Sequence, residues 1–379
     1  MKKIKVMTIL GTRPETIRLS RVMALLDKYT DHIIVHTGQN YDYELNEIFF
    51  KDLNVRKPDY FLAIDCSTLG NIYGNILISI EKVLIKERPD AVLILGDTNS
   101  AIAGIMAKRM KIPIYHMEAG NRCFDFNVPE EINRRIIDHI SDFNLVYTEH
   151  ARRHLLSEGI PHRRIYLTGS PMKEVLLHNM NKIQTSKILD ELKLKQDGFF
   201  LVSMHREENV DNKTHLLSLL NALELVCKEF ALPVIVSTHP RTRKRIDALA
   251  ETKLNSNIQF LKPFGFIDYV YLQMNAFCVI SDSGTISEES SILRFPAITI
   301  RNAFERPEAL DSGNIILTGI SPDTIIQAVK MVTQERESIK KYSIPVEYEI
   351  ENLSQRVVKL IIGTSKLSHL WDGIVKANI

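Results

Sequence analysis

The distribution of hydrophobic residues along the chain predicts an α/β protein. Short, uniformly apolar runs alternate with longer amphipathic stretches. The clearest runs span 5–10, 33–37, 91–95, 114–117 and 145–148, and then 199–204, 234–238, 258–261, 278–281 and 297–300. Runs of this kind are typical of strands buried on both faces. The amphipathic stretches between them, such as 216–230, predict helices that make right-handed crossovers between parallel strands. The two series therefore predict two doubly wound parallel-sheet units in tandem.

A polar, lysine-rich stretch at 172–197 separates the two series and is the best candidate for the interdomain connection. A chain of 379 residues suits two domains of roughly 150–200 residues each. Open α/β domains bind ligands beyond the carboxyl ends of their parallel strands. Polar residues that directly follow the predicted strands are therefore the candidates for a functional site.

Composition and charge exclude several classes of protein. Lys and Arg number 48 against 46 for Asp and Glu, so the balance is not that of a nucleic-acid-binding protein. No uninterrupted apolar run approaches the roughly 20 residues that span a bilayer. The first residues are typical of a strand and not of a signal peptide. The four cysteines form no CxxC pair and fit free thiols in a reducing compartment. We expect a cytoplasmic protein that binds neither nucleic acid nor membrane.

Two turns at strand ends can hold phosphate. Residues 281–285 lead directly into a predicted helix, where backbone N–H groups and the helix dipole favour an anion. An ordinary N-capped helix is the alternative interpretation. Residues 11–15 form the second turn, where Arg13 can grip a diphosphate with two hydrogen bonds. Neither turn contains a GxGxxG or P-loop pattern, which argues against a bound NAD.

Carboxylates and histidines follow other strands. Asp97 and Glu118 follow successive strands, and Glu130 opens a helix after Pro129, where helix capping is its alternative role. Acids that share a cleft raise one another's pKa values, which suits general acid–base catalysis. His205 and His239 are each followed by an arginine within two residues, which favours anion binding over a purely structural role. No HExxH spacing occurs, so we expect no metal.

Taken together, seven ordered motifs resemble the non-hydrolysing UDP-N-acetylglucosamine 2-epimerase family. The motifs span 11–15, 96–98, 118–120, 129–134, 205–209, 282–284 and 305–308. The resemblance implies a GT-B fold of two Rossmann-like domains with a C-terminal helix that crosses back onto the first. We therefore expect one domain at 1–170 plus 362–379 and the other at 171–361. It also implies a cofactor-independent isomerase and a homodimer.

The resemblance assigns roles by position in the motifs. The expected catalytic residues are Asp97, Glu118, Glu130 and His205, the last at a position that also contacts UDP. The expected UDP- and substrate-binding residues are Arg13, Arg18, Arg122, His239, Tyr269, Ser283, Gly284, Glu289, Arg301 and Arg306. Tyr269 replaces a phenylalanine that stacks on uracil in the family, and the exchange keeps the ring. The C2 proton is not α to a carbonyl, so the implied reaction expels UDP to give a 2-acetamidoglycal and then adds UDP back.

Departures from the family pattern indicate which UDP-sugar is the substrate. Arg18 replaces a usual lysine, and the 121–128 segment is two residues shorter than in the glucosamine enzymes. Residues 39–42 depart from the loop that forms an activating substrate site in bacterial relatives, which puts that regulation in doubt. These features resemble the subgroup that makes UDP-N-acetyl-L-fucosamine from UDP-2-acetamido-2,6-dideoxy-L-talose for capsule or O-antigen. The alternatives are a UDP-N-acetylglucosamine 2-epimerase that makes the manno epimer, a retaining GT-B glycosyltransferase, and a non-enzymatic UDP-sugar sensor.

Overall fold

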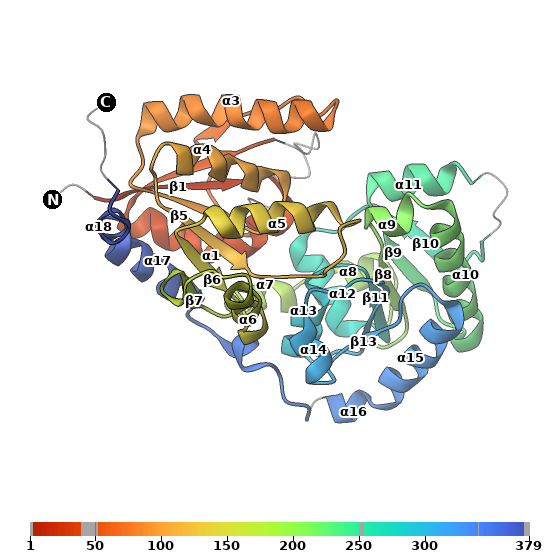
Figure 1. Cartoon of the computed structure of the whole chain (residues 1–379). Helices are drawn as coiled ribbons and strands as arrows, with labels where there is room; N and C mark the ends of the chain where they lie inside the picture. Colours follow the sequence, from red (N-terminus) through yellow and green to blue (C-terminus); the bar gives the residue numbers. More distant parts are fainter. Residues whose placement is uncertain (1–2, 39–49, 51, 250–253, 340, 375–379) are drawn as a thin grey trace. The chain divides into compact units, whose positions relative to one another are not determined.

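The computed structural model describes residues 3–38, 50, 52–249, 254–339 and 341–374, and it contains two compact units (Figure 1). Unit 1 comprises Met1–Leu177 and Glu349–Ile379, and unit 2 comprises His178–Tyr348. Each unit is built around one parallel β-sheet with helices on both faces. The predicted fold class of two doubly wound α/β units is confirmed.

Within the described residues, the sheet of unit 1 has seven strands in the order β3-β2-β1-β4-β5-β6-β7. Its strands are β1 Lys5–Leu10, β2 Asp31–His36, β3 Tyr60–Phe61, β4 Ala91–Leu95, β5 Ile114–Ala119, β6 Phe143–Val146 and β7 Ile165–Leu167. Its helices are α1 Arg13–Tyr29, α3 Leu69–Glu87, η1 Asn99–Ile102, α4 Ala103–Arg109, α5 Pro129–Ile140, α6 Glu149–Ser157, η2 His162–Arg164, α17 Leu353–Thr364 and α18 Leu367–Asp372. Helix α7, Met172–Gln184, contains the boundary to unit 2.

Both faces of this sheet are buried because most positions of its strands carry apolar side chains. In β1, Val6 and Leu10 belong to a core cluster that includes residues of α1 and α17. Met7 and Ile9 belong to another cluster, which includes residues of α3, α4 and α5. Successive side chains of a strand point to opposite faces, so one run of six residues supports two layers of helices.

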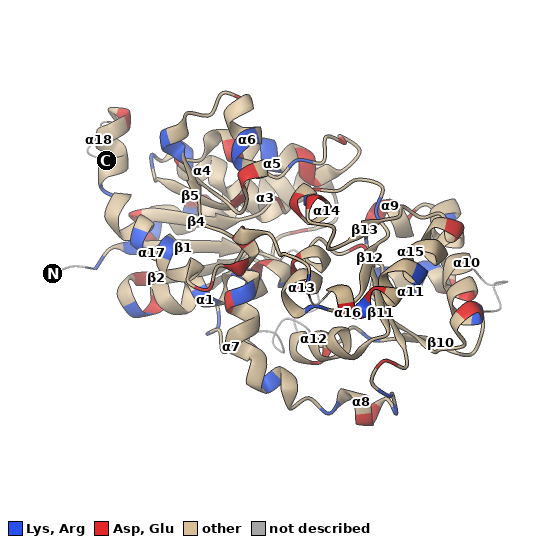
Figure 2. Ribbon diagram, turned by 90° about the horizontal axis from the view of Figure 1, so that it is seen from below, with Lys and Arg blue, Asp and Glu red and all other residues tan. Residues whose placement is uncertain are grey.

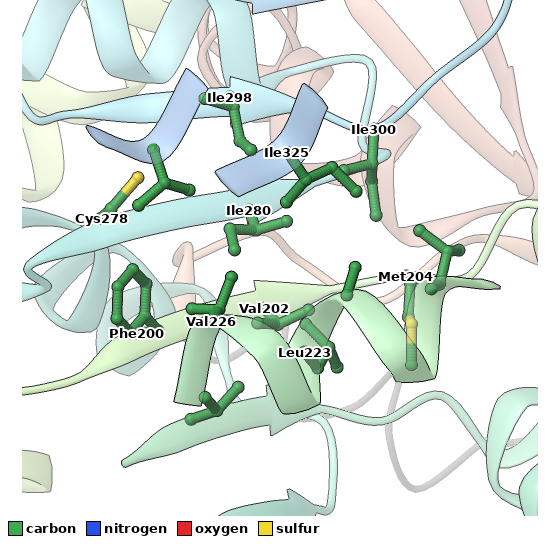
Figure 3. Packing of buried hydrophobic residues seen from close by; sticks show 14 of the residues in the cluster. Phe200, Val202, Met204, Leu223, Val226, Cys278, Ile280, Ile298, Ile300 and Ile325 are labelled. Carbon is green, nitrogen blue, oxygen red and sulfur yellow. The ribbon is translucent and has the colours of Figure 1, made fainter. Parts of the chain in front are cut away.

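The sheet of unit 2 has six described strands in the order β10-β9-β8-β11-β12-β13. They are β8 Phe200–Ser203, β9 Val234–Ser237, β10 Ile258–Leu261, β11 Cys278–Ser281, β12 Ala297–Thr299 and β13 Ile316–Leu317. The helices are α8 Ile188–Glu191, α9 Glu207–Val210, α10 Lys213–Phe230, α11 Pro240–Asp247, α12 Phe266–Asn275, α13 Ile286–Leu293, α14 Pro307–Asp311, α15 Pro322–Gln334 and α16 Arg336–Ile339, and η3 Val346–Glu349 ends at the boundary. Figure 3 shows how Phe200 and Val202 of β8 pack with Leu223 and Val226 of α10.

The boundaries in the structure differ from those expected from the sequence. Residues 349–361, expected in the second domain, belong to unit 1. Leu353, Val357 and Ile361 of α17 are fully buried in the same cluster as β1, and Ser354 donates its backbone N–H to Glu174 at 2.8 Å. The helix is therefore held to unit 1 from its first turn onward.

The predicted strands occur within one or two residues of their expected places, and three further strands were missed. Strands β3, β7 and β13 are only two or three residues long and lie at sheet edges. An apolar run of that length carries too few positions to reveal a period.

Candidate active site

The strand order of unit 1 reverses between β1 and β4, which lie side by side in the sheet. Ligands of open α/β sheets bind beyond the carboxyl ends of the strands at such a point. Five of the residues predicted for the site lie at the carboxyl end of β5 or in the turns and helices that follow β1, β4 and β5. They are Arg13, Arg18, Asp97, Glu118 and Glu130. Acidic and basic residues lie close together on α5, the helix that carries Glu130 (Figure 2).

Asp97 is held by the first turns of α5. Its Oδ2 lies 2.7 Å from Nη2 of Arg134, and its backbone carbonyl accepts a hydrogen bond from Nδ2 of Asn133 at 3.0 Å. Arg134 is oriented in turn by the fully buried Glu131, at 3.3 Å. The Asp97 side chain remains 24% exposed, so its carboxylate is both fixed and reachable.

Glu118 has a strained backbone. Its φ of 66° lies in the left-handed region, and the register of β5 with β6 shifts between Met117 and Ala119. Such strain costs of order 1–3 kcal/mol in a residue with a side chain and is concentrated at functional sites. A bulge re-aims the side chain, and here the Glu118 carboxylate meets Nη1 of Arg18. Arg18, expected as a binding residue, is thus the partner of Glu118. The sequence pointed to Glu118 but gave no sign of the strain.

Glu130 lies partly buried in the first turn of α5. Burial, and to a smaller degree the charge of Glu130, raises the pKa of Tyr73. The Tyr73 hydroxyl donates to Oδ1 of Asn133 at 2.6 Å, and Asn133 also contacts the Asp97 backbone. Glu130 therefore belongs to the same neighbourhood as Asp97.

The structure assigns Arg122 a different place from the one expected. Its side chain is fully buried, and Nη1 lies 2.7 Å from Oδ2 of Asp138. Nε and Nη2 both donate to Glu158, at 2.8 and 2.6 Å. All three nitrogens have partners inside the protein in this conformation, and the expected contact of Arg122 with the substrate stays a prediction. The turn at Gly120, with φ of +81°, lies so close to the Ala151 carbonyl that an added Cβ would be 2.4 Å from its oxygen.

Glu15 is a residue whose importance the sequence did not reveal. Its buried carboxylate accepts hydrogen bonds from Gly11 N at 3.0 Å and Thr12 Oγ1 at 2.7 Å. It also accepts from two residues that follow the neighbouring strand β4, Thr98 Oγ1 at 3.1 Å and Ser100 Oγ at 3.2 Å. Burial raises its pKa to about 7, although these hydrogen bonds lower it. The signal available in the sequence was a glutamate at the third position of a helix after a threonine cap.

Unit 2 has its own reversal, between β8 and β11. Fully buried Asp282 follows β11 and accepts from the backbone N–H groups of His205 and Arg206, both at 3.0 Å. Its other oxygen lies 3.2 Å from Nδ1 of His205, whose side chain is 43% exposed. Asp282 thus holds an accessible imidazole in one orientation. In the sequence, Asp282 stood out only as part of a motif, and this role was not predicted.

The turn after β11 contains Ser283 and Gly284, the residues that the sequence predicted to hold phosphate. Ser283 Oγ lies 3.0 Å from Thr285 Oγ1, and Gly284 follows it just before α13. An added Cβ at Gly284 would lie 3.7 Å from Nη2 of Arg206, an ordinary contact, so space alone does not require glycine there.

The other predicted residues of unit 2 form polar contacts around this sheet edge. Glu289 accepts from Nε2 of Gln273 at 2.6 Å, and burial, followed by the charge of Glu289, raises the pKa of Tyr269. Arg301 is buried and pairs with Glu305 at 2.7 Å.

Arg306 is also buried, and its Nη2 lies 3.5 Å from Glu288. His239 has a structural role at least in part, since its Nδ1 caps α11 by accepting from Arg241 N at 3.3 Å.

Three further expectations concern other parts of the chain. Residues 39–42, expected to differ from an activating loop, lie outside the described residues. In the part of the chain that the structure describes, no group of three or more His, Cys, Asp or Glu side chains is arranged to hold a metal ion. No described helix combines the length and apolarity needed to cross a membrane.

Comparison with known proteins identifies relatives over nearly the whole chain. The sequence model of the UDP-N-acetylglucosamine 2-epimerase family matches residues 24–362. The solved structure of a Rickettsia bellii UDP-N-acetylglucosamine 2-epimerase is 49% identical, with a TM-score of 0.91 over 98% of this chain and 100% of that one. The Methanocaldococcus jannaschii enzyme, solved in complex with UDP-GlcNAc and UDP, is 37% identical with a TM-score of 0.88 over 94% and 99%.

A third relative carries a different substrate in its name. The UDP-2,3-diacetamido-2,3-dideoxy-D-glucuronate 2-epimerase of Pseudomonas aeruginosa is 36% identical over 86% of this chain and 92% of its own length. The solved neighbours share the GT-B-like arrangement of two Rossmann-like domains, which confirms the predicted fold class.

Proposed function

The chain belongs to the UDP-N-acetylglucosamine 2-epimerase family, and we propose that it inverts carbon 2 of UDP-2-acetamido-2,6-dideoxy-L-talose to give UDP-N-acetyl-L-fucosamine. Membership makes the protein an isomerase that carries out C2 epimerisation of a UDP-sugar. The identity of the sugar is the part that we propose. The short 121–128 segment and the side chains that it exposes support this choice.

The proposed chemistry is an elimination followed by an addition. A base removes the C2 proton, and the electron pair of that bond forms a C1=C2 double bond. The bond between C1 and the UDP oxygen breaks, and its electron pair leaves with UDP. UDP then attacks C1 of the resulting 2-acetamidoglycal, and C2 receives a proton on the opposite face. Atoms and electrons balance without an external oxidant, but the route requires an acid or base on each face and a tightly held diphosphate.

We assign the proton transfers to the carboxylates of unit 1. The observation that carries this assignment is the pair of carboxylates after neighbouring strands, each fixed by its own arginine. Asp97 is held by Arg134, and Glu118 by Arg18 from a strained backbone. Such pairing fixes the direction of each carboxylate before substrate arrives. Glu130 is the third acid, placed near Asp97 through Tyr73 and Asn133.

We assign the grip on UDP mainly to unit 2. His205, oriented by Asp282, can donate to a phosphate oxygen, and the turn at Ser283 and Gly284 leads into the amino end of α13, whose dipole favours an anion. We assign Arg301 and Arg306, which pair with Glu305 and Glu288, to the charge that stabilises the diphosphate. The remaining proposed contacts come from Arg13, His239, Tyr269 and Glu289, with the Tyr269 ring stacking on uracil and Glu289 accepting from the ribose.

The sugar preference is argued from the 121–128 segment. Phe124 and Phe126 are 65% and 66% exposed, and Phe124 has a φ of 56°, which a bulky residue rarely adopts. The Arg135 guanidinium lies 5.2 Å from the centre of the Phe126 ring. Aromatic side chains in a sugar-facing segment suit the C6 methyl of a 6-deoxy sugar better than a hydroxymethyl group. An apolar contact with one such group discriminates by about 10–200-fold.

Deuterium exchange tests both the reaction and the sugar. The chain is incubated in heavy water with UDP-2-acetamido-2,6-dideoxy-L-talose or with UDP-N-acetylglucosamine, and C2 is followed by NMR. We expect deuterium at C2 with inversion and a higher kcat/KM for the talose sugar. If only UDP-N-acetylglucosamine exchanges, the proposed talose substrate is refuted, but the proposed C2 epimerisation is still supported. Failure of both sugars to exchange would refute both.

A matched pair of variants sharpens the comparison. Phe126→Ala is expected to reduce the preference for the talose sugar. Tyr29→Ala removes another half-exposed aromatic ring from unit 1, on α1, and is expected to leave the preference unchanged. Equal effects of the two variants would contradict the role of the 121–128 segment.

The deuterium-exchange experiment also distinguishes two other candidate functions. UDP-N-acetylglucosamine is the substrate class in the names of the Rickettsia and Methanocaldococcus relatives, and it is the direct alternative. A retaining glycosyltransferase would share the UDP site but has no need for three acids at the sugar-binding end of unit 1. Transfer of sugar to an acceptor without C2 exchange would favour it.

We further propose a cytoplasmic homodimer whose product enters capsule or O-antigen synthesis. All four cysteines are free thiols, which suits a reducing compartment. Sedimentation equilibrium of the purified chain tests the oligomeric state, and a single monomeric species would contradict the dimer.

A further inference from the structure

A buried histidine–aspartate pair contacts the turn at Gly96, which leads to Asp97, and the turn at Gly120, two residues after Glu118. His116 belongs to β5 and Asp138 to α5, and both side chains are fully buried. Nδ1 of His116 lies 2.8 Å from Oδ1 of Asp138. Neither residue can touch a sugar from this position, so any part in catalysis must act through other groups.

The pair contacts the backbone of both turns. Nε2 of His116 lies 2.8 Å from the Gly96 carbonyl oxygen, and because a carbonyl can only accept, Nε2 carries the hydrogen. Oδ2 of Asp138 accepts from Gly120 N at 3.1 Å. Gly96 directly precedes Asp97, and Gly120 comes two residues after Glu118. One hydrogen-bonded pair therefore joins the ends of β4 and β5.

Both turns are backbone segments that need external support. Gly96, Glu118 and Gly120 have φ values of +71°, 66° and +81°. Conformations of this kind persist in a residue with a side chain only where the surroundings determine them strongly. In addition to the β4–β5 ladder, His116 donates to the Gly96 carbonyl and Asp138 accepts from the Gly120 N–H.

Arg122 belongs to the same arrangement. Its Nη1 lies 2.7 Å from the Asp138 oxygen that accepts from Gly120, and its other nitrogens bind Glu158. Asp138 is therefore contacted by His116 on one oxygen and by Arg122 on the other. These two partners lower the pKa of Asp138 against the opposing effect of its burial.

We propose that His116 and Asp138 are positioning residues that fix Asp97 and Glu118 relative to each other for proton transfer at C2. This inference rests on the proposed function, since it takes the two carboxylates as the groups that act on C2. Buried ion pairs often do no more than satisfy one another, and their removal then affects only stability. The two roles differ in their effect on kcat.

The chain offers a matched control in the same sheet. His32 of β2 is another buried histidine, with Nδ1 2.7 Å from Asp27 and Nε2 2.9 Å from Thr8 Oγ1. It pairs in register with Val6, near the amino end of the strands and away from the turns of the site. His32→Phe thus removes a similar set of hydrogen bonds where no proposed catalytic group is attached.

The test compares kcat, KM and melting temperature for His116→Phe and His32→Phe with the sugar that the unaltered chain epimerises. We expect both variants to melt at lower temperature. His116→Phe should lose about 10²-fold in kcat, the size expected when reacting groups are misplaced by about 1 Å, with KM and the Kd for UDP changed less than threefold. His32→Phe should keep kcat within threefold. Equal kcat in the two variants would overturn the proposal.

A second variant separates loss of positioning from misfolding. A double-mutant cycle separates failure of the positioning proposal from failure of the proposed function. His116→Gln can donate to the Gly96 carbonyl and should recover part of the lost kcat. Asp97→Asn is measured first: its loss of C2 exchange supports the assigned role, so that a later negative result counts against positioning alone. Adding His116→Phe to Asp97→Asn should then reduce exchange by clearly less than 10²-fold, because only the positioning of Glu118 is still lost. A full 10²-fold further loss would show that His116 acts independently of Asp97 and would refute its action through that residue.

Discussion

Glu15→Gln provides a quantitative test of the buried carboxylate that joins the β1 and β4 turns. The Glu15 side chain is almost fully buried, and its pKa rises from 4.5 to about 7. Desolvation is the largest cause, because the four hydroxyl and backbone donors around it do not replace full hydration. The native protein therefore binds a proton more tightly at this site than the unfolded chain does.

The sign of the effect follows from that difference. A carboxyl with a raised folded-state pKa contributes most stability below its unfolded pKa, and that contribution is lost as pH rises through about 7. A rise of the pKa from 4.5 to about 7 corresponds to about 3 kcal/mol between pH 4.5 and pH 8. Glutamine keeps the shape and does not titrate. The free energy of unfolding of Glu15→Gln minus that of the unaltered chain should therefore increase by about 3 kcal/mol over this range.

Calorimetric unfolding of the full chain at pH 5, 6, 7 and 8 measures this difference. In a domain of 150–250 residues, each kcal/mol moves Tm by about 2–4 °C, so the transition of unit 1 should shift clearly. Ser100→Ala serves as a second arm: it removes one donor, which should raise the pKa of Glu15 and move the pH-dependent window upward. A difference between Glu15→Gln and the unaltered chain that stays flat from pH 5 to 8, or that falls, would refute the reasoning.

Three further predictions concern the site. Glu118→Gln should lower C2 exchange by about 10²–10³-fold with the Kd for UDP unchanged, because it removes the proposed proton-transfer group and not a UDP contact. Exchange at the normal rate would contradict the proposed role of Glu118. Arg122→Met should destabilise unit 1 by about 3–5 kcal/mol, because it leaves buried Asp138 without its cation, while UDP affinity measured by calorimetry stays within threefold. Weakened UDP binding at unchanged Tm would restore the ligand role for Arg122. Asp282→Asn should weaken UDP binding about tenfold, or about 1.4 kcal/mol, since His205 loses its orienting carboxylate, and an unchanged Kd would argue against that function.

The sequence predicted the parts of this molecule that depend on local pattern. The apolar runs located the long strands, and the polar residues after them located Asp97 and Glu118. The direction of a side chain could not be predicted in this way. Arg122 follows one of the motifs, but its guanidinium pairs with Asp138 and Glu158 inside the protein. The return of a C-terminal helix to the first domain was expected from the resemblance, but its start was placed too late, because the attachment of α17 to β1 joins residues more than 300 positions apart.

The missed functional candidates share one physical feature. Glu15 and the pair His116–Asp138 are buried polar groups whose partners lie on other elements. A sequence shows each as a polar residue near an apolar run, and nothing in the local pattern indicates what it contacts. The strain at Glu118 is likewise a property of the fold, since φ at a strand end is set by the packing around it.

Positional isotope exchange tests the central claim, inversion at C2 through loss and return of UDP, most directly. The UDP-sugar carries ¹⁸O in the bridge between C1 and the β-phosphate, and the reaction runs in heavy water. The account predicts that ¹⁸O spreads into the non-bridging β-phosphate oxygens while deuterium enters C2 with inversion, because free UDP can rotate before it adds back. Inversion with ¹⁸O retained entirely in the bridge would show that the C1–O bond never breaks, and would contradict the account.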